Sequence, residues 1–199
     1  MDLLLAWPLP GARELGARLV ASYDHPDRGY HDSQHLREVL ERITELSVQG
    51  TSFDRMPVLL AAWFHDGVYD GQPDAERRSA AWASEALPGL VGPEVVDEVV
   101  RLVLLTETHR PADDDANGCA LSDADLGILA APLHRYEEYV AAVRREYAHL
   151  EDDVFAAGRA DVLRSLAAKP HLFHTAFARE QWEQAARSNL DRELATLGG

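Results

Sequence analysis

Apolar residues recur every three to four positions along most of the chain, and this spacing limits the possible folds more than any other feature of the sequence. Between residues 30 and 48 it places one apolar stripe along a helix: Leu36, Val39, Leu40, Ile43 and Leu46. The same period predicts helices over 10–22, 56–66, 74–87, 93–109, 133–149, 152–168 and 178–197. No useful stretch alternates apolar and polar residues as a half-buried strand does. We therefore expect an all-α protein, a compact bundle of about eight helices.

Length and charge narrow the possibilities further. The 199 residues suit a single domain, and 46% of them are hydrophobic, which is enough for a substantial core. The formal net charge is -15, and Lys169 is the only lysine. Such an acidic surface repels extended DNA or RNA, whereas a small phosphorylated molecule can bind where a metal ion and a few arginines reverse the local field.

The chain carries no sign of export or of a membrane anchor. Cys119 is the only cysteine, so no disulfide can form within the chain. The first residues lack the basic and long apolar segments of a signal peptide, and no run approaches the ~20 apolar residues of a membrane span. We expect a cytoplasmic protein that does not engage a membrane.

Two segments combine histidine and aspartate in ways that favour a metal site. On a helix, His31 and His35 lie four residues apart and share a face, although two surface histidines would look the same. His65 and Asp66 end an apolar helix, where an ionised carboxylate needs a partner such as a divalent cation. The alternative for this pair is an ordinary helix C-terminal turn.

A third segment holds two aspartates. Ser122 followed by Asp125 is typical of an acidic capping box, with Asp123 free in the first turn of the helix, and either aspartate can instead ligate a metal. Together, the three segments supply two imidazoles and two carboxylates. Such a set suits one divalent ion such as Mn, Mg, Fe, Co, Ni or Zn, and it leaves positions for water and a phosphate oxygen.

The order His…His-Asp…Asp resembles the HD-domain superfamily of metal-dependent phosphohydrolases. More closely, segments 30–35 (YHDSQH), 64–69 (FHDGVY) and 123–126 (DADL) resemble the bacterial subgroup described as predicted metal-dependent HD phosphohydrolases. The resemblance runs from Arg28 to the tail around 189–194. It implies one HD-type helical domain over 1–199, with a metal-binding core at about 28–130 and C-terminal helices over 133–197.

The resemblance also implies roles for individual residues. His35, His65 and Asp66 would be metal ligands. The alanine before the last aspartate in several HD families favours Asp125 as the fourth ligand, whereas the capping argument favours Asp123. Asp66 would also orient the attacking water, and His31 would contact the substrate or donate a proton.

Three further residues are candidates for substrate binding. Arg28 carries a planar guanidinium suited to phosphate, Arg77 opens a helix, and His109 lies near a helix end. Each can equally be a solvated or helix-capping group.

The expected function is hydrolysis of a small phosphorylated metabolite, with nucleotides among the candidates. The main alternative is a non-catalytic module that binds metal and nucleotide for regulation. A purely structural protein and an oxygenase with two irons, which could recruit His31 and His109, are further alternatives. The apolar face of 178–197 could also pair two copies in a homodimer.

Overall fold

Helix is the regular structure of residues 2–72 and 74–197, the part of the chain that the computed structural model describes. No strand occurs within these residues, so the all-α prediction is confirmed. The elements are α1 (Leu3–Ala6), the 3-10 turn η1 (Pro10–Ala12), α2 (Arg13–Tyr23), α3 (Ser33–Val48), α4 (Arg55–Phe64), α5 (Ala75–Ala86), α6 (Pro93–Leu105), α7 (Ala116–Asp125), the 3-10 turn η2 (Leu126–Ala130), α8 (Leu133–Glu146), α9 (Asp152–Ala167), α10 (Ala176–Gln181) and α11 (Glu183–Leu197).

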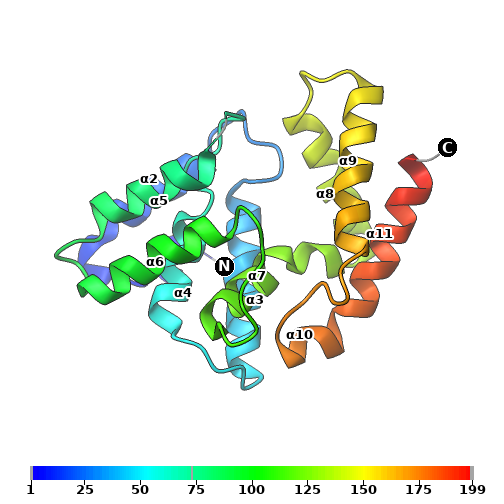
Figure 1. Ribbon diagram of the computed structural model, residues 1–199. Coiled ribbons are helices and arrows are strands. Elements are labelled where there is room, and N and C mark those ends of the chain that lie inside the picture. Colours follow the sequence, from blue (N-terminus) through cyan, green and yellow to red (C-terminus); the bar gives the residue numbers. More distant parts are fainter. Residues whose placement is uncertain (1, 73, 198–199) are drawn as a thin grey trace.

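Helices α3 and α7 occupy the centre of the molecule, with α2, α4, α5 and α6 on one side and α8 to α11 on the other (Figure 1). Helix α4 packs against α3, α6 and α7, and most of its surface is buried because it is apolar nearly all round. Its buried residues are Pro57, Val58, Leu60, Ala61, Ala62, Trp63 and Phe64. No helix in the described part of the chain has both the length and the apolar character needed to cross a membrane.

The C-terminal helices buttress the end of α7. The side-chain amide of Asn189 on α11 donates hydrogen bonds of 2.9 Å to the carbonyl groups of Leu129 and Ala131, which follow α7. On the same helix, Glu193 accepts a hydrogen bond of 2.7 Å from Arg159 of α9. These contacts fix α11 against α9 and against the segment that follows α7.

Two helix starts differ from the sequence predictions. Helix α3 begins at Ser33 because the carboxylate of Asp32 accepts hydrogen bonds from the backbone N–H groups of Gln34 and His35. His31 therefore lies in the preceding turn, and the prediction that it shares a helix face with His35 is wrong. Helix α7 begins at Ala116, well before the Ser122 that the sequence suggested as its cap, because Asp115 caps it through the N–H of Gly118.

Two helix ends also differ. The helix predicted over 93–109 ends at Leu105, and the chain turns before His109. The helix predicted over 178–197 is broken at Trp182, whose ring is buried against Phe173 and Phe177. Burial of this large ring therefore coincides with the change of helix direction.

Candidate metal centre

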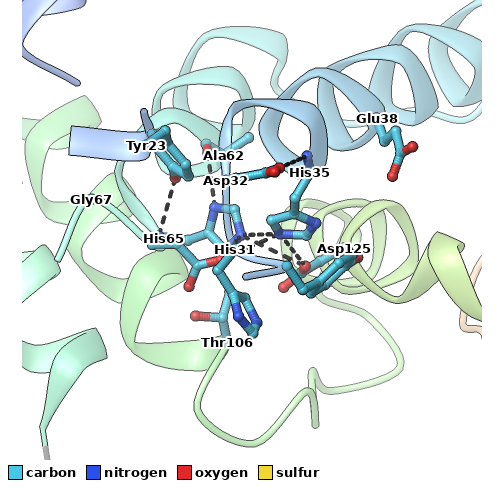
Figure 2. A network of polar contacts seen from close by, with 12 residues as sticks. Tyr23, His31, Asp32, His35, Glu38, Ala62, His65, Gly67, Thr106 and Asp125 are labelled. Atoms are coloured by element: carbon cyan, nitrogen blue, oxygen red, sulfur yellow. Dashed lines mark hydrogen bonds and ion pairs between the residues drawn. The ribbon is translucent and has the colours of Figure 1, made fainter. Parts of the chain in front are cut away.

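Four side chains from distant parts of the sequence meet where three helices adjoin. His35 lies in the first turn of α3, His65 and Asp66 follow the end of α4, and Asp125 is the last residue of α7 (Figure 2). The Nε2 atoms of the two histidines are 3.1 Å apart. Asp66 Oδ2 lies 3.3 Å from the Nε2 of His35 and 3.0 Å from that of His65. Asp125 Oδ1 lies 3.3 Å and 3.6 Å from the same two atoms. We call these four residues the His–Asp cluster.

Three residues of the His–Asp cluster could hold a metal ion. His35, His65 and Asp66 each offer one ligand atom, and these atoms lie within 4.8 Å of one another. Both histidines are buried, and the carboxylates are only slightly exposed, at 12% for the Asp66 side chain and 13% for Asp125. Buried carboxylates and imidazoles that converge without separate partners form the mixed nitrogen and oxygen set that divalent cations prefer.

Local structure sets the orientation of each ligand. The Nδ1 of His65 lies 2.8 Å from the carbonyl oxygen of Ala62, so Nδ1 must be the donor and Nε2 is the ring atom that can ligate a cation once its proton is displaced. The backbone N–H of Asp66 donates to the hydroxyl of the fully buried Tyr23. A tight turn follows, in which the N–H of Gly67 bonds to the carbonyl of Phe64 at 2.8 Å. The chain can thus leave α4 while both side chains point inward.

Electrostatics within the cluster are strongly coupled. Burial lowers the pKa of His35, but hydrogen bonds to Asp125 and Asp66 outweigh burial and raise the pKa from 6.5 to about 9. Burial raises the pKa of both carboxyl groups, yet the charge of His65 and the hydrogen bonds from the histidines hold these pKa values well below their usual range. Protons on the imidazoles therefore balance the carboxylates when no cation does so, and a cation would displace those protons.

Asp123 does not belong to the cluster. Its Oδ1 and Oδ2 accept hydrogen bonds of 2.7 Å from the backbone N–H groups of His174 and Thr175, before α10. Burial raises its pKa to about 6 despite these two bonds. The prediction of Asp123 as a metal ligand is wrong, because its carboxylate tethers the C-terminal helices to α7. The capping-box interpretation is also wrong, because Ser122 lies within α7 and not at its start.

His109 approaches the cluster from outside. Its Nε2 lies 3.6 Å from Asp125 Oδ2, the oxygen that does not face the other histidines. Its backbone has a φ of +49°, in the left-handed region that costs a residue with a side chain about 1 kcal/mol or more. Its Nδ1 is buried and has no hydrogen-bond partner among the described residues. The predicted substrate contact through His109 therefore stays a prediction, now with a defined place beside Asp125.

His31 lies next to the cluster and is held by a carboxylate. Its Nδ1 is 2.9 Å from Glu146 Oε2, and its ring stacks on Tyr69 with centroids 3.9 Å apart. Glu146 Oε1 also accepts hydrogen bonds from the backbone N–H groups of Gly29, Tyr30 and His31. Burial raises the pKa of Glu146, but these bonds outweigh burial and lower it. The imidazole ring centroid of His31 is 5.6 Å from that of His35.

The two arginines predicted to bind substrate have other contacts. The guanidinium of Arg28 donates to the carbonyl oxygens of His31, Asp66 and Gly67, at 2.6, 2.8 and 3.1 Å. It braces the two segments that carry the cluster, and these contacts give no support to a phosphate-binding role. Arg77 is 66% exposed and lies 3.6 Å from a carboxylate oxygen of Asp74, and no contact joins it to the cluster.

Sequence reasoning missed Glu146. It lies 115 residues from His31 at the end of α8, where an acidic residue at a helix end carries no signal of its own. Comparison of the chain with protein-family models, curated proteins and solved structures found no match. The function must therefore be argued from the site itself.

Proposed function

We propose that the protein is a metal-dependent phosphohydrolase of the HD-domain type that acts on a small phosphorylated compound, with nucleotides among the candidates. One observation carries the proposal. The His–Asp cluster lies beside a further histidine, His31, whose ring is held by a carboxylate and is 24% exposed. A ligand set for a cation and a proton-transferring group within reach of it are the parts that phosphate hydrolysis needs.

The cluster residues would hold one divalent cation, with Mn, Mg, Fe, Co, Ni and Zn as candidates. When bound, the cation would supply Lewis acidity, which polarises a phosphoryl oxygen and makes water a better nucleophile. Asp66 is slightly exposed at the edge of the cluster, and its carboxylate would orient the attacking water.

His31 would assist departure of the leaving group. Hydrolysis joins the oxygen of water to phosphorus and breaks the bond between phosphorus and the leaving oxygen, which then needs a proton. Since Nδ1 of His31 is bonded to Glu146, Nε2 is the ring atom left to exchange that proton. Glu146 positions the ring and has no direct part in the reaction.

Charge favours a small substrate. The formal net charge of -15 opposes a long polyanion. Arg28 bonds to backbone carbonyl groups and Arg77 lies at the surface, so neutralisation of the phosphate would fall to the cation and the nearby histidines.

The test is turnover by the purified protein after chelation and reloading with each candidate metal. We expect release of phosphate or pyrophosphate from a panel of phosphorylated compounds with at least one metal. His65→Ala and Asp66→Asn should abolish turnover with the helical content unchanged. The control His134→Ala, at an exposed position on α8, should keep full activity.

Two results would overturn the enzyme proposal. Absence of both turnover and any thermal shift with Mn would leave a structural protein. Binding of metal and nucleotide without turnover would favour the regulatory module.

A further inference from the structure

A groove lined mainly by apolar and aromatic side chains begins at His31 and extends away from the His–Asp cluster. Its volume is about 400 Å³, within the range of small-molecule sites. Its lining comes from the segments around Tyr30 and Tyr69, from α8 and α9, and from the turn between these two helices. Its lining residues are Tyr30, His31, Tyr69, Tyr139, Val143, Tyr147, Leu150, Val154, Phe155, Gly158, Arg159 and Val162. We call it the aromatic groove.

The walls of the aromatic groove are regular helix faces. Tyr139 and Val143 on α8 and Tyr147, which caps that helix, recur every four residues. On α9, Val154, Gly158 and Val162 also recur every four residues. Val154 and Val162 remain 55% and 53% exposed. A contiguous apolar surface that stays exposed in a hollow marks a binding site more often than an accident of packing.

Arg159, the charged residue at the end of the groove nearest α11, already has protein partners. The guanidinium of Arg159 donates to Glu193 at 2.7 Å and to the Tyr139 hydroxyl at 2.9 Å. At the other end, His31 is bonded to Glu146. The buried hydroxyl of Tyr30 has no partner and offers a bond to a ligand, but the edge of a nucleobase or a sugar would lose more hydrogen bonds with water here than this one group returns. An apolar ring loses none, and rings pack well against the five aromatic side chains.

The groove adjoins the proposed catalytic site through His31 and Tyr30, whereas His35 and Asp125 line a neighbouring cavity of about 240 Å³ that Tyr30 also lines. His31 lines the groove and stacks on Tyr69, and its centroid is 5.6 Å from that of the cluster residue His35. Tyr30 contacts residues on both sides, with its ring centroid 4.7 Å from that of the cluster residue His35 and 4.5 Å from that of the groove residue Tyr139. A molecule with its phosphate group at the cluster would thus direct its organic group into the groove.

We propose that the aromatic groove binds the organic group of the substrate and that this group is an apolar aromatic ring, so that the preferred substrates are aryl phosphate esters. This inference rests on the proposed phosphohydrolase function and names its substrate class. The groove selects by shape and by burial of apolar surface, and the cluster holds the phosphate.

Gly158 allows the groove to be filled without disturbing the cluster. A Cβ atom at this position meets no heavy atom within 4 Å. Because glycine is unfavourable inside a helix, Gly158→Leu should leave α9 at least as stable while its side chain occupies the groove. Ala157→Leu is the matched control, since Ala157 is the exposed neighbour on α9 and does not line the groove.

The experiment measures binding to the Mn-loaded protein by calorimetry, using two phosphonates that cannot be hydrolysed. Naphthylmethylphosphonate carries the ring and methylphosphonate lacks it. We expect the ring to improve affinity at least about tenfold, and Gly158→Leu to remove about tenfold for the naphthyl compound alone. Ala157→Leu should change neither affinity.

Equal affinities for the two phosphonates, or an unaltered naphthyl affinity in Gly158→Leu, would overturn the inference. A shift from dimer to monomer in Gly158→Leu, seen by sedimentation, would assign the groove to a second copy of the chain and overturn it too. Turnover of naphthyl phosphate separates the two proposals. Ring-dependent binding without turnover would refute the hydrolase and keep the groove, whereas turnover indifferent to the ring and to Gly158→Leu would refute the groove alone.

Discussion

Replacement of Asp125 by asparagine should remove most of the stabilisation that the fold gains from a bound metal. Asp125 Oδ1 lies 3.3 Å and 3.6 Å from the Nε2 atoms of His35 and His65, so under the proposal its carboxylate would supply one of four donor groups. Asparagine keeps the size of the side chain but removes its negative charge. The same change at Asp123, two residues earlier, is the matched control.

The size of the effect follows from mass action. At a metal concentration about 100 times the Kd, binding stabilises the folded state by about 2.7 kcal/mol. For a protein of this length, that raises the melting temperature by about 5–10 °C. If the loss of a ligand weakens binding about 100-fold, as even outer-shell changes can, the gain falls to about 0.4 kcal/mol, or about 1–2 °C.

Asp123→Asn should behave in the opposite way. It disturbs two hydrogen bonds of 2.7 Å to backbone N–H groups, which should lower the stability of the fold by about 1–3 kcal/mol. The thermal shift with metal should stay at its full size. The assay is thermal unfolding of each variant over a titration of Mn, with far-ultraviolet circular dichroism as the check on folding. A full metal shift in Asp125→Asn, or its loss in a folded Asp123→Asn, would refute the assignment.

Three other predictions follow from the site. Folding raises the pKa of His35 from 6.5 to about 9. Protonated His35 should therefore add its full contribution to the stability of the metal-free protein below about pH 6.5. As the pH rises to about 9, thermal melts should show the metal-free protein losing on the order of 3 kcal/mol of stability, while the stability added by Mn grows. A stability that does not change with pH would contradict this prediction. His31→Asn should lower kcat by about 100-fold or more and leave the metal shift unchanged, and Glu146→Gln should act in the same direction but less strongly; unchanged turnover in both would exclude the proton-transfer role. Arg28→Met breaks three hydrogen bonds to carbonyl groups and should cost about 2–4 kcal/mol in chemical denaturation, whereas the exposed Arg77→Met should stay within about 0.5 kcal/mol.

The fold class and the segments of the site could be predicted from the sequence because both depend on local patterns. An apolar residue every three to four positions buries one face of a helix wherever that helix packs. The His65 and Asp66 pair was also identifiable, because a buried carboxylate beside a histidine needs compensation in any fold, and the resemblance to HD-domain proteins implied His35. Helix starts were harder to predict, since the late start of α3 and the early start of α7 depend on which aspartate accepts the free N–H groups.

Tertiary structure alone decided between Asp123 and Asp125. Two residues apart on a helix, their side chains point about 200° apart, so only one can face the histidines. Which one does so depends on how α7 is rotated against its neighbours, and the packing of η2 and α11 sets that rotation. The same reason explains Glu146, which meets His31 across 115 residues, and Arg28, whose partners are backbone groups. The sequence alone determined the residue types and their helical spacing. The packing of whole helices determined which side chains come together.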